Sequence, residues 1–194
     1  MQSIEIEVKF RVHDLKALEA QLSQFGFRCK TPRTFERNVL FDTPARELRA
    51  TRQILRLRRY GDRWVLTHKQ TTPNDSPVAR HKERIETETV VEDGEAVASI
   101  FRVLGYTFTF VYEKWRSEWA DTGGHCVLDE TPIGLYAELE GPREWIDGML
   151  TALKIDPADV TTLSYGRLFE TWKQETGSSA ENMSFAEIQP ALAR

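Results

Sequence analysis

The sequence of 194 residues has only two cysteines, Cys29 and Cys126, which cannot build a disulfide framework. Its four histidines lack the spacing, with one another or with cysteine, that zinc sites require. No apolar run approaches the length of a membrane span, and no apolar leader precedes the first charged segment. These absences predict a cytoplasmic protein with reduced thiols, no zinc site and no place in a membrane.

The sequence also lacks the features with which many proteins hold nucleic acids or nucleotides. Its formal net charge is −4, whereas a dedicated nucleic-acid binder normally carries an excess of basic residues. It has no Walker-type Gly-x-x-x-x-Gly-Lys loop, no dinucleotide-binding fingerprint and no Gly-x-Ser-x-Gly elbow. We therefore expect no nucleic-acid partner, and any polyanion that binds must meet basic side chains gathered locally.

Composition and length fit one sizeable globular domain, because 40% of the residues are hydrophobic and 29% are charged. We expect this domain to span residues 1–175 and to be followed by a polar C-terminal tail over residues 176–194. The oligomeric state is not legible from the sequence. A homodimer is the assembly we keep open, since it is the commonest closed one.

Alternation of apolar and polar residues predicts a mostly antiparallel sheet joined by glycine-containing turns. The expected strands cover approximately residues 4–12, 36–42, 53–60, 63–70, 82–91, 107–119, 125–130 and 135–141. Helical spacing of apolar residues predicts helices at about residues 14–25, 94–104, 142–153 and from 156 onward.

Charged residues share one face of each strand. Glu5, Glu7 and Lys9 alternate with apolar residues in the first strand, and later strands repeat this pattern. If the apolar faces point outward beneath the helices, the fold is α+β, an eight-stranded antiparallel closed β-barrel with helices packed outside. Its interior would hold Lys9, Arg56, Arg58, Lys69, Arg84, Lys114 and Arg116 beside Glu5, Glu7, Glu86, Glu88, Asp129, Glu138 and Glu140.

Such an interior indicates which kind of ligand the protein binds. Dry burial of an ion costs several kcal/mol, so the charges must be hydrated, paired with one another, or matched to a charged guest. Guanidinium and ammonium groups suit phosphate oxygens, while clustered carboxylates suit Mg²⁺ or Mn²⁺. The implied guest is a metal-bound polyphosphate. The alternative is that each charged face is the solvated side of a sheet, which is common for a single strand but less so for most strands of one chain.

The charged segments also occur in a characteristic order. The N-terminal Glu5-x-Glu7-x-Lys9 is followed by Phe41-Asp42-Thr43-Pro44, Leu55-Arg56-Leu57-Arg58, Leu66-Thr67-His68-Lys69, Arg84-Ile85-Glu86-Thr87-Glu88, Glu113-Lys114-Trp115-Arg116, Val127-Leu128-Asp129 and Leu135-Tyr136-Ala137-Glu138-Leu139-Glu140, with Ser164-Tyr165 near the C-terminus. Over about residues 2–173 this set resembles the CYTH superfamily, the triphosphate tunnel metalloenzymes, which include class IV adenylyl cyclases and thiamine triphosphatases.

The resemblance implies a role for each charged residue. By position, the metal-binding carboxylates would be Glu5, Glu7, Asp129, Glu138 and Glu140. The triphosphate-binding bases would be Lys9, Arg56, Arg58, Lys69, Arg84, Lys114 and Arg116, and the catalytic set Glu5, Glu7, Lys9 and Lys69. Glu86 and Glu88 match further acidic tunnel positions. The implied cofactor is Mg²⁺ or Mn²⁺, and the implied partner is a small-molecule triphosphate.

Two loop positions depart from the family pattern. Arg46 follows Ala45 where an acidic residue is common, and Arg52 stands where a glycine often precedes the Leu-Arg-x-Arg strand. Because both sites lie in a loop, they bear on how a substrate enters rather than on the fold.

The resemblance leaves three functions open. The first, which the wording of the motifs favours over the other two, is a class IV adenylyl cyclase-like enzyme that converts ATP to cyclic AMP and pyrophosphate. The second is a triphosphatase acting on tripolyphosphate, thiamine triphosphate or a nucleoside triphosphate. The third is a sensor that binds polyphosphate or a nucleotide without turnover. A shared tunnel does not by itself establish cyclisation.

Overall fold

The computed structural model describes residues 2–73 and 79–192. The strands in these residues are β1 (Gln2–Val12), β2 (Arg28–Asp42), β3 (Ile54–Tyr60), β4 (Arg63–Thr71), β5 (Lys82–Val91), β6 (Thr107–Ala120), β7 (His125–Thr131), β8 (Gly134–Glu140) and β9 (Val160–Thr161). The helices are α1 (Leu15–Gln24), α2 (Glu47–Ala50), α3 (Gly94–Val103), α4 (Arg143–Ala152), α5 (Tyr165–Thr176) and α6 (Phe185–Leu192), with a 3₁₀ turn over Pro157–Asp159.

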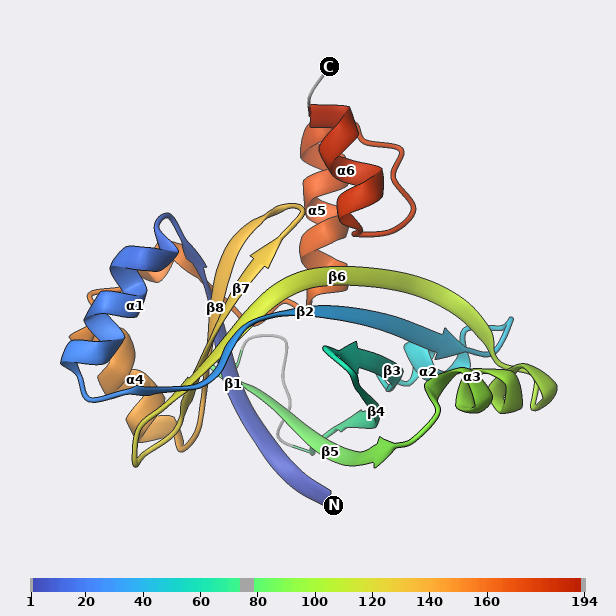
Figure 1. Ribbon diagram of the computed structural model, residues 1–194, viewed down its shortest axis with the longest axis horizontal. Coiled ribbons are helices and arrows are strands. Elements are labelled where there is room, and N and C mark those ends of the chain that lie inside the picture. The colour runs from blue at the N-terminus through green and yellow to red at the C-terminus, as the bar shows by residue number, and fades with distance from the viewer. Residues whose placement is uncertain (1, 74–78, 193–194) are drawn as a thin grey trace.

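The strands close into an antiparallel barrel. The order is β5-β4-β3-β2-β6-β7-β8-β1, and pairing of β1 with β5 completes the ring. β1 achieves this by pairing residues 2–7 with β5 and residues 7–12 with β8, while β9 adds to β1 beside Lys9 and Phe10. Figure 1 shows β2 and β6 as long curved strands that arch over the barrel. The predicted eight-stranded closed barrel is confirmed.

Apolar side chains of the barrel face outward, toward the helices. Val8 of β1 and Leu139 of β8 are fully buried, in one cluster with Leu22 of α1 and Ile146 of α4. α1 begins after Asp14, whose carboxylate accepts a hydrogen bond from a backbone N–H of the first turn. Figure 1 shows α1 and α4 together at one end of the molecule and α2 and α3 at the other. Because the apolar faces of the strands point outward, the charged faces line the interior of the barrel.

Two predicted boundaries are wrong. β2 begins at Arg28 rather than near residue 36, because its first part contains Pro32 and register shifts that interrupt the alternation. The region from residue 156 is not one helix: a 3₁₀ turn and β9 precede α5, which begins only after Ser164. The Ser164 hydroxyl accepts a hydrogen bond from the backbone N–H of Arg167 and so fixes that start.

The segment after Gly177 folds back onto β6. The backbone N–H of Met183 donates to the carbonyl of Val111 at 3.0 Å, and the N–H of Glu113 donates to the carbonyl of Met183 at 2.9 Å. β7 pairs with β6 only over residues 115–120, so these bonds cover an edge of β6 that β7 leaves open. Met183 and Ile188 are fully buried. The polar composition of this segment gave no sign of this packing.

None of the helices in the described part of the chain is both long enough and apolar enough to cross a membrane.

Replacement of Met183 by alanine should test this packing. The side chain is fully buried, so Met183→Ala should lower the free energy of unfolding by about 2–5 kcal/mol, as measured by urea denaturation. Met149 of α4 is only partly buried, and Met149→Ala should therefore cost clearly less. Equal losses for the two variants would show that residues 178–192 contribute little to the fold.

Candidate active site

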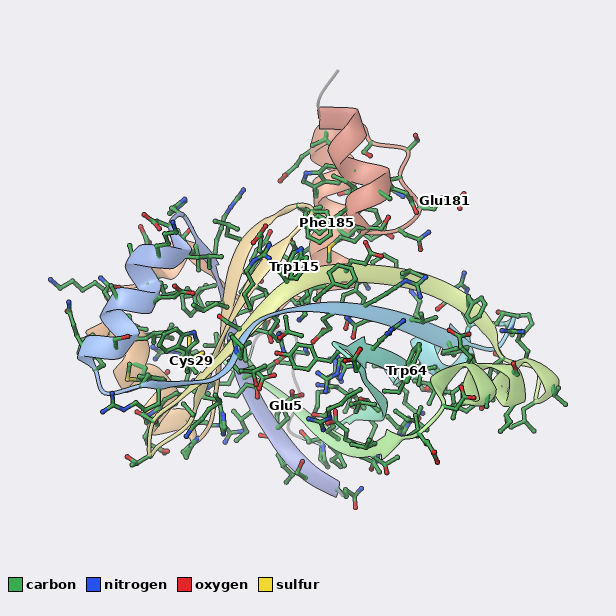
Figure 2. The ribbon with its side chains drawn as sticks, viewed as in Figure 1. Glu5, Cys29, Trp64, Trp115, Glu181 and Phe185 are labelled. Atoms are coloured by element: carbon green, nitrogen blue, oxygen red, sulfur yellow. The ribbon has the colours of Figure 1, made fainter. Side chains whose placement is uncertain are left out.

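The interior of the barrel, which we call the tunnel, is lined by charged side chains. Lys9, Lys114 and Asp129 are 3%, 2% and 0% exposed. Every residue predicted for the interior is buried or half-buried: Glu5, Glu7, Lys9, Arg56, Arg58, Lys69, Arg84, Glu86, Glu88, Lys114, Arg116, Asp129, Glu138 and Glu140. Figure 2 shows Glu5 in the middle of the molecule, where β1 crosses below β2. The structure thus brings the predicted set together.

Three carboxylates converge at one place in the tunnel. Glu5, Glu7 and Glu140 each place an oxygen within 4.8 Å of the others. The strand register of the barrel causes this. Glu7 of β1 lies opposite Glu140 of β8, and Glu5, two residues earlier, lies on the same face of β1. We call Glu5, Glu7 and Glu140 the carboxylate cluster.

The three members of the carboxylate cluster differ in their basic partners. The ammonium group of Lys69 donates to both oxygens of Glu5, at 2.8 and 2.6 Å. Lys82 donates to Glu7. No hydrogen bond or ion pair joins the Glu140 carboxylate to a basic residue in the described part of the chain.

These partners separate the pKa values. Burial and, after it, the negative charges of Glu5, Glu138 and Glu7 together raise the pKa of Glu140 to about 8, against the opposing effect of nearby Arg116. Burial also raises the pKa of Glu5, with Glu7 adding to the effect. Burial would raise the pKa of Glu7 as well, but Lys82 and other lysines outweigh it and lower the pKa to about 2.

A divalent cation fits the carboxylate cluster. Crowded buried carboxylates repel one another, and Mg²⁺ or Mn²⁺ would relieve that repulsion with the hard oxygen ligands these ions prefer. The cluster contains three of the five residues for which the sequence predicted metal binding.

Asp129 and Glu138 lie among bases instead. Asp129 accepts hydrogen bonds from Lys114 at 3.0 Å and from two nitrogens of Arg116 at 2.7 and 2.6 Å. The hydroxyl of Tyr165 also donates to Asp129, at 2.5 Å. Glu138 accepts from Arg116 at 2.7 Å and from Lys9. With their oxygens engaged in this way, both carboxylates are suited to holding the bases in place.

Three further bases, from β3 and β4, pair with acids of β5. Arg58 of β3 donates to Glu88 of β5 at 3.1 Å, and Lys69 of β4 lies 3.3 Å from Glu86. Arg56 donates to the hydroxyl of Tyr112 at 3.2 Å and lies 3.7 Å from Glu86. Glu86 and Glu88 therefore orient bases.

Sequence analysis missed two charged members of the site. Glu36 is fully buried, 3.4 Å from the ammonium group of Lys114 and 3.7 Å from the guanidinium of Arg58. In this part of β2 the local pattern of residue types does not show which face points inward. The pairing of Glu36 with Lys114 of β6 shows it. Lys82, which binds Glu7, shares strand parity with Arg84, and this signal alone would have identified it.

The chain is similar to proteins of one known family. The CYTH domain model matches residues 3–147. A curated protein from Methanocaldococcus jannaschii, provisionally named an adenylate cyclase, is 28% identical over 138 residues, which cover 71% of this chain and 76% of that protein.

Solved structures share the fold. A provisionally named adenylate cyclase from Vibrio parahaemolyticus superimposes with a TM-score of 0.74 at 20% identity, covering 87% of this chain and 98% of that one. A protein from Hippeastrum, provisionally named an adenylyl cyclase and described as revealing a dominant triphosphatase activity, has a TM-score of 0.61 at 20% identity, covering 88% and 96%.

The pKa of Glu140 predicts how stability depends on pH. Because its pKa rises from 4.5 to about 8 on folding, the metal-free folded state binds more protons than the unfolded state between these values. The melting temperature of metal-free protein should therefore fall as pH rises from 5 to 8. Glu140→Gln should flatten this slope and raise the melting temperature at pH 8, because the amide carries no charge that burial would penalise. A slope unchanged in Glu140→Gln would contradict the assignment.

A second pair of variants separates cation binding from base positioning. Asp129→Asn leaves Lys114 and Arg116 without their shared anion, so it should destabilise the fold by about 3–5 kcal/mol in urea. Titration with Mn²⁺ should show weaker binding for Glu140→Gln and near-normal binding for folded Asp129→Asn. Equal loss of Mn²⁺ affinity in both would make Asp129 a ligand.

Proposed function

Because the chain belongs to the CYTH family, we propose that it is a divalent-cation-dependent enzyme that binds a triphosphate in the tunnel and hydrolyses it. One observation carries the proposal: a cluster of three carboxylates and a set of organised bases share one closed, charged interior. A triphosphate with a bound cation complements both groups at once, because it presents negative oxygens to the bases and a positive ion to the acids.

We assign the carboxylate cluster to the cation. Glu5, Glu7 and Glu140 would hold Mg²⁺ or Mn²⁺. When bound, such an ion neutralises phosphate charge and makes the phosphorus easier to attack. The carboxylates must be deprotonated to bind it, so we expect the activity to favour the alkaline side of neutrality, where Glu140 loses its proton.

The tunnel bases would bind and orient the phosphate oxygens. They are Lys9, Arg56, Arg58, Lys69, Arg84, Lys114 and Arg116. Most are already held by acids from neighbouring strands, so little reorganisation is needed when a substrate enters. Phosphoryl transfer asks for positioning and charge neutralisation more than for covalent help, and pre-organised cations supply both.

Hydrolysis asks less of this site than cyclisation does. Attack on a phosphorus by water needs only the phosphates and the cation in place, whereas cyclisation also needs a nucleoside held with its 3′-hydroxyl facing the α-phosphorus. The similarity to the Hippeastrum protein supports hydrolysis. Formation of cyclic AMP is the second candidate, supported by the name of the relative from Methanocaldococcus jannaschii.

A sensor without turnover fits less well. Binding alone would use the bases, but three nearby carboxylates weaken the binding of a polyanion unless a cation joins them. The carboxylate cluster therefore favours chemistry over simple recognition.

Product analysis tests the proposal. Tripolyphosphate, thiamine triphosphate and ATP are each incubated with Mg²⁺, with Mn²⁺ or with a chelator, and the products are resolved by chromatography. We expect orthophosphate with either cation and none with the chelator. Glu5→Gln should lower kcat/KM by about 100-fold or more, whereas Glu95→Gln, an exposed control on α3, should match the wild type.

The other outcomes each select a different function. Cyclic AMP and pyrophosphate from ATP, without orthophosphate, would make the protein a cyclase. Binding of tripolyphosphate without any product would indicate a sensor that binds without turnover.

A further inference from the structure

A pocket of about 670 Å³ opens beside α2, at one mouth of the tunnel. Its lining combines the end of β2, the start of β3 and the start of α5, and it includes an apolar wall around Leu40 and Phe110. Six basic side chains line it: Arg46, Arg49, Arg52, Lys82, Arg84 and Arg167. We call this pocket the basic mouth.

Three of these bases differ from those inside the tunnel. Arg46, Arg49 and Arg167 are exposed, and within residues 2–73 and 79–192 their guanidinium groups have no hydrogen bond or ion pair. In the described part of the chain, no acid that lines the pocket forms an ion pair with these three arginines. Asp42 already accepts hydrogen bonds from three backbone N–H groups, at 2.8, 2.9 and 2.9 Å, and Glu170 and Glu181 are exposed.

The basic mouth continues into the carboxylate cluster. Lys82 lines the mouth and also donates a hydrogen bond to Glu7, a member of that cluster. On the opposite side, α5 begins at the mouth, with Ser164, Gly166 and Arg167 in the lining. The first turn of a helix carries partial positive charge and favours anions. Basic residues therefore extend from the carboxylate cluster to the outside and outnumber the acids Asp42, Glu170 and Glu181 in the lining.

We propose that the basic mouth binds phosphate groups beyond the third, so that the preferred substrate is a linear inorganic polyphosphate longer than tripolyphosphate. This inference rests on the proposed function, since the tunnel would take the terminal phosphates. Arginine binds phosphate oxygens in pairs of hydrogen bonds, and three guanidinium groups without an anionic partner gain most from a polyanion. The apolar wall could carry an organic group, but it would leave those charges uncompensated.

The test compares substrates of different length and charge. We would measure kcat/KM for tripolyphosphate, for a linear polyphosphate several times longer at equal concentration of chain ends, and for ATP. The proteins are the wild type, Arg46→Gln/Arg49→Gln, and the control Arg28→Gln/Arg63→Gln. The control removes the same charge from exposed positions of β2 and β4 outside the mouth.

We expect the wild type to prefer the longer chain. Arg46→Gln/Arg49→Gln should lower kcat/KM for that chain by about tenfold relative to its effect on tripolyphosphate, and the control should not. The rate with the longer chain should also fall more steeply with salt than the rate with tripolyphosphate, because more phosphates are contacted. Equal effects on the two phosphates would overturn the inference, as would a loss with ATP as large as that with the longer chain.

Direct binding separates this inference from the proposed function. If no protein turns over tripolyphosphate, the proposed function fails, and calorimetric titration with the longer polyphosphate becomes the readout. Weaker binding by Arg46→Gln/Arg49→Gln than by the control would support the basic mouth alone. Equal binding by the two variants would refute it.

Discussion

The pairing of opposite charges inside a closed barrel is the constraint on which the rest of this structure depends. Charged groups removed from water are costly unless each finds a partner, and a closed ring of strands brings partners from every side. Arg116 illustrates this: it is held by Asp129 of β7 and Glu138 of β8. Because the interior is taken by ions, the apolar faces must turn outward, and helices are needed to cover them.

Strand parity explains why so much of this could be predicted from the sequence. A period of two places every second residue on the same face, so Glu5, Glu7 and Lys9 had to share a face once β1 was recognised. Closure of the barrel was predicted because the repeated charged faces could be enclosed together only if the apolar faces turned outward beneath the helices. Where Pro32 and register shifts break the period, as in the first part of β2, the prediction failed.

Pairing between strands could not be predicted in the same way. Parity shows that Asp129 and Glu140 point inward, but only the register shows that Glu140 meets Glu7 and that Asp129 meets Arg116. The sequence therefore predicted which charged residues lie inside the barrel. It did not predict which acids form the carboxylate cluster and which acids hold the bases. Buried Met183 was missed for a related reason, because its partner edge on β6 is distant in sequence.

The loop that carries α2 holds two arginines in an uncommon backbone conformation at the edge of the basic mouth. Arg46 and Arg52 both have positive φ values, 60° and 57°, a conformation that costs most residues about 1–3 kcal/mol and that glycine adopts freely. Glycine would therefore stabilise this loop, yet arginine occupies both positions beside the tunnel. The backbone conformation alone does not account for arginine at these positions, and the anionic ligand proposed for the basic mouth would give Arg46 a role there. Since the barrel fixes the carboxylate cluster and the tunnel bases, such loops are the part of the molecule in which the proposed preference for longer phosphate chains would be set without disturbing the interior.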